Sequence, residues 1–178
     1  MTRLMPRQPV PALDVPTAGG PAWSLAAQQP ARFTLVVFFR GLHCPICRTQ
    51  LRDLQTKLPD FEKRGVSVIA LSSDDEERAT RTKTEWGLDG LTLGYGLSLP
   101  KAREWGLYVS AGRGKTSIGV EEPAQFSEPG LFLIRPDGTL YFASVQTMPF
   151  ARPQFADILN AIDFVVAKDY PARGEVAA

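Results

Sequence analysis

The chain has few reactive side chains and no long hydrophobic run. Its 178 residues include two cysteines and one histidine, and the longest purely apolar stretch runs only from Leu35 to Phe39. A structural zinc site needs about four ligands, and a membrane-spanning helix needs about 20 apolar residues. We therefore expect neither a bound metal nor a segment inserted in a membrane.

Charge and targeting signals are equally sparse. The formal net charge is +1, so no bulk field attracts nucleic acid or an anionic membrane. The N-terminal stretch MTRLMPRQPVPALDVP has arginines and prolines but no apolar core, which argues against a signal peptide. We expect a cytoplasmic, reducing location, where two close cysteines are more often catalytic or metal-binding than structural.

The composition indicates one globular domain. Apolar residues make up 44% of the chain and charged residues 22%, which is ordinary for a soluble protein, and this length can bury a full core. We predict a single domain over residues 1–178. Residues 1–31 are expected to form an extended lead-in, with a hairpin packed on the outside, and residues 169–178 a surface tail.

The centre of the chain has the pattern of two buried strands joined by a helix. Segments 33–39 (FTLVVFF) and 66–72 (VSVIALS) are apolar and β-rich, typical of strands in a parallel sheet. Between them, apolar residues recur at steps of three and four, which indicates a helix. Pro59 should kink or interrupt this helix, and Gly65 fits its end. The order predicts a right-handed parallel crossover.

The rest of the chain adds helices and a strand pair. Residues 130–144 have the pattern of strand, turn and strand, and a closing helix should start near Pro153. Residues 110–128 have no period and are expected to form a long loop. The elements together predict an α/β fold with a mixed central β-sheet flanked by helices on both faces.

All cysteine and histidine side chains of the chain lie between His43 and Cys47, just after the first buried strand. If a helix begins at Pro45, Cys44 is its N-cap and Cys47 lies in its first turn. Residues three apart on a helix are about 5 Å apart, close enough for a disulfide. The free N–H groups at a helix N-terminus favour a thiolate. We therefore prefer a redox pair to two buried core cysteines or to zinc ligands.

Two neighbours of the pair are candidate supporting residues. His43 could give the thiolate of Cys44 a hydrogen bond or a charge, although a loop residue without catalytic duty is the favoured interpretation. Arg48 could add positive potential, but we favour a place on the solvated helix face.

The segment GRGKT at Gly112–Thr116 superficially resembles a phosphate-binding loop. That motif requires glycine where this chain has Val109, and no strand-to-helix pattern surrounds it. We therefore expect no nucleotide binding and interpret the segment as a flexible basic loop.

Four stretches carry a family resemblance: LVVFFRGLHCPIC, GVSVIALSSD, KAREWGL and PGLFLIRPDGTLYF. With their order and spacing, roughly residues 8–168 resemble thioredoxin-fold proteins of the peroxiredoxin-like group, the alkyl hydroperoxide reductase and thiol-specific antioxidant relatives. The resemblance implies a thioredoxin-like fold with an N-terminal extension. It also implies a thiol-dependent oxidoreductase with antioxidant activity.

The resemblance admits two alignments of the site. The peroxiredoxin pattern P-x-x-x-[ST]-x-x-C, ending on Cys47, meets Arg40 in place of the proline and Cys44 in place of Ser or Thr. The family's peroxide-binding arginine would fall near Pro129, where no arginine stands. Thioredoxin-like oxidoreductases instead carry C-x-x-C and a cis-proline before the same strand. Cys44, Cys47 and Pro129 fit both places, which implies a cis bond between Glu128 and Pro129.

Three functions remain open at this point. In a thiol–disulfide oxidoreductase, Cys44 would attack a partner's disulfide and Cys47 would resolve the mixed disulfide. In a peroxidase, Cys47 would react with a hydroperoxide and the C-x-x-C disulfide would then close. The third function is a non-enzymatic redox-sensing or interaction module. We expect Cys44 to be the more exposed thiol with the lower pKa.

The implied partners follow from this chemistry. The oxidised pair needs an external thiol reductant, of thioredoxin or glutathione type, and the substrate is a hydroperoxide or a protein disulfide. We expect no cofactor, no nucleic acid and no membrane partner, and the resemblance allows a homodimer.

Overall fold

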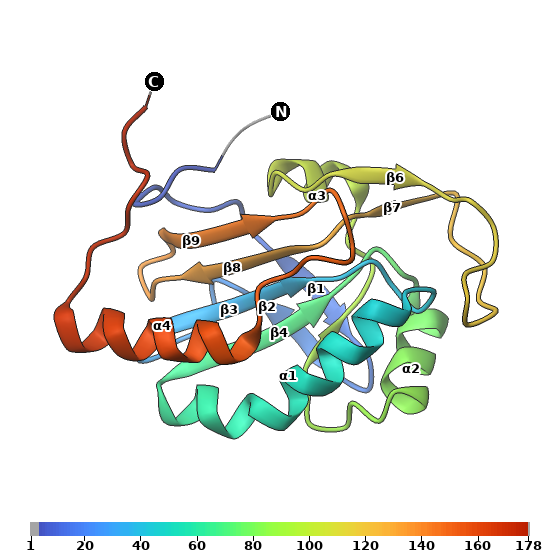
Figure 1. Ribbon diagram of the computed structural model, residues 1–178, viewed down its shortest axis with the longest axis horizontal. Coiled ribbons are helices and arrows are strands. Elements are labelled where there is room, and N and C mark those ends of the chain that lie inside the picture. Colours follow the sequence, from blue (N-terminus) through green and yellow to red (C-terminus); the bar gives the residue numbers. More distant parts are fainter. Residues whose placement is uncertain (1–3, 178) are drawn as a thin grey trace.

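The computed structural model describes residues 4–177 and has a seven-stranded mixed sheet at its centre (Figure 1). The strand order is β2-β1-β5-β4-β3-β8-β9, and β6 and β7 form a separate pair. The strands are β1 (Asp14–Thr17), β2 (Gly20–Ser24), β3 (Phe33–Phe38), β4 (Val66–Leu71), β5 (Leu93–Gly94), β6 (Val109–Ala111), β7 (Gln125–Ser127), β8 (Gly130–Ile134) and β9 (Leu140–Val145). The helices are α1 (Pro45–Lys63), α2 (Glu76–Glu85), α3 (Leu99–Glu104) and α4 (Phe155–Lys168).

The predicted strand–helix–strand unit is confirmed. β3 and β4 pair in parallel from Phe33 opposite Val66 to Phe38 opposite Leu71, and every residue of β3 is buried. The expectation that Pro59 interrupts the helix is wrong, because α1 is continuous through this residue. One face of the helix buries Cys47, Leu51, Leu54 and Phe61. This packing offsets the hydrogen bond that Pro59 cannot make near the helix end.

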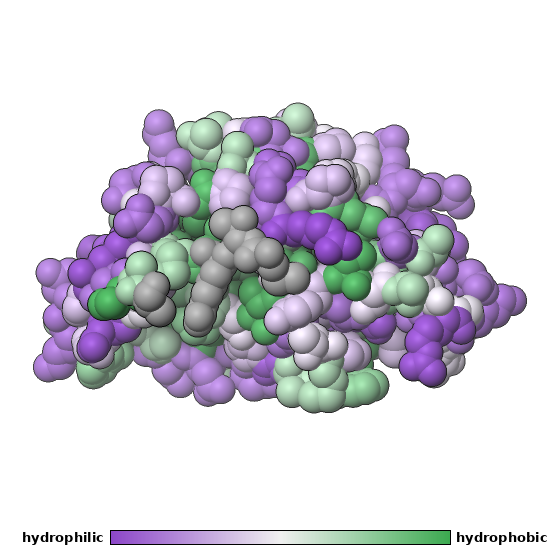
Figure 2. Space-filling view, turned by 90° about the horizontal axis from the view of Figure 1, so that it is seen from above, coloured by the Kyte–Doolittle hydropathy of each residue, from purple (hydrophilic) through white to green (hydrophobic). Residues whose placement is uncertain are grey.

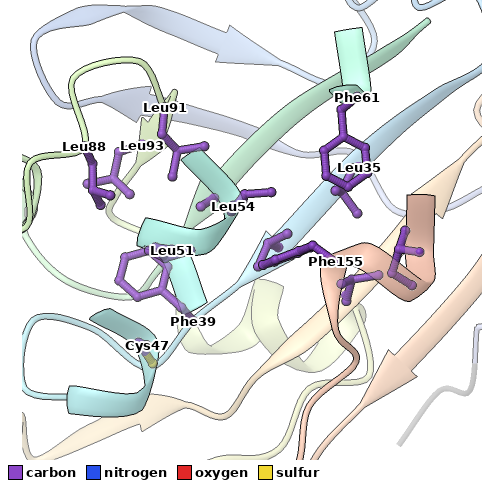
Figure 3. Close-up of a cluster of buried hydrophobic side chains, with 14 of the residues drawn as sticks. Leu35, Phe39, Cys47, Leu51, Leu54, Phe61, Leu88, Leu91, Leu93 and Phe155 are labelled. Atoms are coloured by element: carbon purple, nitrogen blue, oxygen red, sulfur yellow. The ribbon is translucent and has the colours of Figure 1, made fainter. Parts of the chain in front are cut away.

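Helices cover both faces of the sheet, as predicted. On one face, α1 and α4 lie side by side, and side chains from both helices pack against alternate residues of β3, including Leu35 (Figures 1 and 3). On the other face, Trp105 at the end of α3 packs against Phe38 and Phe132. Because side chains alternate across a strand, β3 contributes to both cores.

The N-terminal lead-in forms the expected hairpin, but it is not only an external cover. β1 pairs with β2 and also with β5, where Thr17 lies opposite Gly94. The lead-in therefore extends the central sheet. β5 has only two residues, and pairing with β1 covers an edge that would otherwise expose backbone groups.

The segment 110–128 is an ordered hairpin and not a loop without structure. β6 pairs with β7, and the turn region is closed by backbone hydrogen bonds from Gly112 to Ala124 (2.9 Å) and from Glu122 to Gly114 (3.0 Å). The two strands have three residues each, too few for a recognisable alternation. The GRGKT segment lies in this hairpin, away from any strand-to-helix turn.

The surface on the side of the two termini is mainly hydrophilic, with separate hydrophobic patches (Figure 2). The tail beyond α4 is tied to the N-terminal segment, because the Arg7 guanidinium donates two hydrogen bonds to the carbonyl oxygen of Ala172 (2.8 and 3.0 Å). Among residues 4–177, no helix combines the length and apolar character needed to cross a bilayer.

Candidate active site

Cys44 and Cys47 form a disulfide at the N-terminus of α1, immediately beyond the carboxyl end of β3. Cys44 is the N-cap and Pro45 the first helical residue, as predicted. The Cα atoms of the two cysteines are 5.2 Å apart, within the range of an unstrained bridge. The two thiols can therefore be joined or separated without refolding of the helix.

Both cysteines are fully buried, each with 0% exposure. The expectation that Cys44 is the more exposed thiol is therefore wrong. The reason is a covering segment that local helix geometry does not reveal: Arg152, in the irregular segment 146–154 between β9 and α4, reaches both sulfur atoms. We call this segment the strap.

Three hydrogen-bond donors surround the sulfur atoms. The backbone N–H of Cys47 donates to Sγ of Cys44 (3.2 Å), as an N-cap requires. The backbone N–H of Arg40 donates to Sγ of Cys47 (3.4 Å). Nη2 of Arg152 lies 3.3 Å from Sγ of Cys47 and 3.6 Å from Sγ of Cys44. All three donors would stabilise a thiolate, and two of them favour Cys47.

Arg152 is the site residue that the sequence did not reveal. It lies 105 positions from Cys47 in the chain, next to Pro153. This proline was expected in the first turn of the last helix but precedes the N-cap Gln154 of α4. Burial, and to a smaller degree the charge of Arg40, lower the pKa of Arg152 to about 10, while Glu128 acts in the opposite direction. The guanidinium is therefore still a cation at neutral pH. It supplies a positive charge at the cysteine pair, whereas the sequence has no arginine near Pro129, where the family's peroxide-binding arginine was expected.

Pro129 is at the cysteine end of the sheet, but its peptide bond is not cis. No cis bond occurs among residues 4–177, so this expectation is wrong. The chain continues in an extended form from β7 to β8: Glu128 donates its N–H to Tyr108 (2.7 Å) and Pro129 accepts from Gln146 (3.0 Å). An extended residue before proline suits the trans isomer, which is favoured by about 0.5–1 kcal/mol.

His43 is buried and uncharged. Burial, with further contributions from Arg40 and Arg78, lowers its pKa to about 3. Nη2 of Arg78 is 3.4 Å from Nδ1 of His43, and because a guanidinium only donates, Nδ1 is the acceptor. The ring packs on Phe126 with centroids 4.5 Å apart. At neutral pH, His43 therefore offers no positive charge to Cys44.

The other two predicted supporting residues, Arg48 and Pro45, do not contact the sulfur atoms by hydrogen bonds. Arg48 is exposed, in agreement with the favoured interpretation as a residue of the solvated helix face. Pro45 is half-buried and starts the helix. Among residues 4–177, no group of three or more His, Cys, Asp or Glu side chains is arranged to hold a metal ion.

The hairpin of β6 and β7 is joined by ion pairs to the loop between β3 and α1. The Arg40 guanidinium contacts Glu122 (3.3 Å) and Glu128 (3.2 Å), and both carboxylates are almost completely buried. Arg78 also donates to the carbonyl oxygen of Glu121 (3.1 Å). This hairpin therefore encloses the loop that precedes Cys44.

Asp74 fixes the backbone of the same loop. Its carboxylate accepts the N–H of Leu42 (2.8 Å) and pairs with Nε of Arg78 (2.8 Å). Burial raises the pKa of the Asp74 carboxyl, and the two hydrogen bonds partly offset that shift. Gly41 has φ +134°, and a Cβ there would lie 2.7 Å from the carboxylate. The close approach thus requires glycine.

Known proteins with similar sequences are peroxiredoxins by name. A protein of Mycobacterium tuberculosis that is provisionally named a peroxiredoxin is 33% identical over 87 residues, 49% of this chain and 55% of that protein. The 1-Cys peroxiredoxin of Onchocerca volvulus is 26% identical over 157 residues, 82% of this chain and 61% of that protein. The chain thus spans between 55% and 61% of the length of these curated relatives.

A solved structure shows the same fold. The mitochondrial 2-Cys peroxiredoxin of Plasmodium falciparum has a TM-score of 0.72 at 16% identity, covering 98% of this chain and 100% of that chain. The thioredoxin-like α/β fold is therefore confirmed. The profile of the AhpC/TSA family matches residues 6–143. With the cysteine pair in place at the start of α1, the chain belongs to the AhpC/TSA family.

Proposed function

We propose that the protein is a thiol-dependent peroxidase in which Cys47 reacts with a hydroperoxide and Cys44 resolves the product. The observation that carries this proposal is the convergence of Arg152 and the N–H of Arg40 on Sγ of Cys47. A guanidinium at 3.3 Å stabilises the thiolate and the negative charge that develops on the departing oxygen. Family membership supports the same chemistry.

The cycle has three balanced steps. The Cys47 thiolate attacks one peroxide oxygen, the O–O bond breaks, and the sulfur becomes sulfenic acid. The other oxygen takes a proton from water and leaves as an alcohol or water. The Cys44 thiol then displaces the hydroxyl of the sulfenic acid, which forms the disulfide and releases water. An external dithiol, or two monothiols, reduces the disulfide and becomes oxidised itself.

A thiol–disulfide oxidoreductase is the second candidate. Its support is the N-cap position of Cys44, whose sulfur accepts the N–H of Cys47 at 3.2 Å. In that function Cys44 has the lower pKa, as expected from the sequence, and attacks a disulfide in a partner protein. A redox-sensing module without turnover is the third candidate, and it would use the same pair.

The proposed chemistry also suggests partners and location. We propose an external reductant of thioredoxin or glutathione type, because the oxidised pair cannot regenerate itself. We also propose a cytoplasmic location, where such reductants are maintained, and a homodimer as the assembly to test first. Residues 1–178 are proposed to act as one domain without an organic cofactor.

Peroxide consumption and disulfide reduction, measured side by side on one preparation, test the proposal. With a thiol reductant present, the wild type should consume hydroperoxide, and the Cys47→Ser variant should consume none. Reduction of insulin disulfides should be slow in comparison. Rapid insulin reduction without peroxide consumption would support the oxidoreductase, and the absence of both activities would support the sensing module.

A further inference from the structure

Arg152 is the only side chain that links the strap to the cysteine pair and α1 by hydrogen bonds within residues 4–177. Its Nε donates to the carbonyl oxygen of Pro149 inside the strap (2.8 Å), and its Nη1 donates to Oε1 of Gln50 on α1 (2.6 Å). The third nitrogen, Nη2, faces both sulfur atoms. Because a guanidinium is planar and rigid, the first two contacts fix the position of the third.

The remainder of the strap is loosely held. Met148 is 47% exposed and Phe150 is 74% exposed, so these apolar side chains contribute little burial to the closed position. A depression of about 370 Å³ lies beside the strap and is lined by Ile46, Gln50, Phe150 and Arg152, among others. The strap could therefore be displaced without disruption of the main cores.

The covered disulfide presents an access problem. Reduction requires a thiolate to approach one sulfur atom, form a mixed disulfide and expel the other sulfur as a thiolate. A second thiolate then attacks the mixed disulfide and releases the oxidised reductant. Both sulfur-bearing residues have 0% exposure while the strap is closed, so the first attack cannot occur in this conformation.

We propose that the strap is a gate over the Cys44–Cys47 disulfide, latched by Arg152 to Gln50, and that an external thiol reduces the disulfide only after the gate opens. The gate rests on the proposed function in one respect, namely that the pair is reduced from outside. The Gln50 amide accepts a hydrogen bond from Arg152 and does not contact the sulfur atoms, so it acts as a positioning residue. Its neutral amide makes a latch of intermediate strength.

Two substitutions of Gln50 should move the gate in opposite directions. Gln50→Met removes the acceptor of the Arg152 bond at similar volume, and reduction should become about tenfold faster, the factor typical of a lost bond to a charged group. Gln50→Glu replaces the amide with a carboxylate of the same shape, and a charge-assisted bond should make reduction several-fold slower. Gln55→Met, on the same helix but bonded to Gly87 and Gly90, is the matched control and should react as wild type does.

The experiment follows reduction of the oxidised protein by dithiothreitol. Samples are quenched with acid at set times, alkylated, and analysed by mass spectrometry. For the wild type, the rate should level off at high dithiothreitol, because opening then becomes limiting. The proposal is overturned if Gln50→Met is no faster than wild type, if Gln50→Glu is no slower, or if the Gln55→Met control changes as much as Gln50→Met.

The outcome is separable from the peroxidase proposal, because this assay contains no peroxide. If the reduction rate falls in the order Gln50→Met, wild type, Gln50→Glu while no peroxide is turned over, the gate is supported and the peroxidase is rejected. Peroxide turnover with unchanged reduction rates would reject the gate alone. General loss of stability in a variant cannot imitate the slower reduction expected for Gln50→Glu.

Discussion

The two sides of the cysteine pair are enclosed in different ways. On the hairpin side, Arg40 of the loop before Cys44 forms buried ion pairs with Glu122 and Glu128, which lie on either side of β7. Asp74, paired with Arg78 of α2, accepts the N–H of Leu42 in the same loop. On the strap side, one guanidinium and one amide form the connection, and large apolar side chains remain open to solvent. Charges that are buried together are costly to separate, whereas a half-exposed bond between a guanidinium and a neutral amide can exchange with water. The hairpin side therefore holds the thiols in position, whereas the strap on the other side can move away from them.

The largest stability effect should come from the hairpin side. Asp74→Ala leaves the Leu42 N–H and the Arg78 guanidinium without their buried acceptor. We expect the free energy of unfolding to fall by about 3–5 kcal/mol, measured by urea denaturation. Asp89→Ala, at an exposed loop position, should change it by less than about 0.5 kcal/mol. Equal effects in the two variants would remove the distinction between the two sides.

The next effect is a pH dependence that originates at His43. Its folded-state pKa of about 3 is below the ordinary histidine value of 6.5, so the unfolded chain binds a proton first as the pH falls. The stabilising contribution is full above 6.5 and is lost progressively between 6.5 and about 3. The wild type should therefore lose stability relative to His43→Gln by up to about 1.4 kcal/mol per pH unit in this window. Thermal or urea unfolding of both proteins at several pH values measures it, and parallel curves would contradict it.

The strap side should give a smaller effect on stability. Gln50→Met removes one hydrogen bond to a half-exposed guanidinium, so the free energy of unfolding should fall by only about 1.5 kcal/mol. The same urea titration provides the comparison with Asp74→Ala. A loss as large as that of Asp74→Ala would mean that the strap is a structural support and not a gate.

The smallest effect is expected at Arg48, which follows Cys47 in sequence but points to solvent. Arg48→Ala should leave the alkylation rate of the reduced thiols within about a factor of two, because an exposed charge is screened by water and salt. Arg152→Ala should instead raise the thiol pKa obtained from alkylation against pH, because the guanidinium beside the sulfur atoms is lost. An equal rise of the thiol pKa in Arg48→Ala would show that general positive potential, and not the contact of Arg152, activates the thiol.

The scaffold of the site was predictable because its signals are local. The apolar run 33–38, the helical spacing after Cys44 and the turn at Gly138 lie within single elements, and these elements were confirmed. The predicted interruption at Pro59 was wrong because a helix interior tolerates the loss of one backbone hydrogen bond when its apolar face is well packed. The lead-in was predicted only to pack on the outside of the domain. Its place in the central sheet could not be foreseen, because β1 pairs with a sheet edge at β5, which is far away in the chain.

The surroundings of the thiols were not predictable because they are non-local. Arg152 meets the sulfur atoms across more than a hundred residues, and no periodic pattern marks an irregular strap. The same strap explains why Cys44 is buried although an N-cap is often accessible. The burial that makes His43 neutral comes partly from Phe126 in the hairpin, whose strands are too short to recognise. For the chemistry of the site, as distinct from its scaffold, the two-cysteine motif was the one strong local signal.

The position of sulfenic acid after brief exposure to peroxide is the most direct measurement of the proposed chemistry. Reduced Cys44→Ser and Cys47→Ser variants are mixed with hydrogen peroxide, trapped with a sulfenic-acid probe and analysed by mass spectrometry, while alkylation against pH gives each thiol pKa. The donors around Sγ of Cys47 predict the lower pKa and rapid labelling at Cys47 in Cys44→Ser, with little labelling in Cys47→Ser. Rapid labelling of Cys44 in Cys47→Ser, with an unreactive Cys47 in Cys44→Ser, would contradict it.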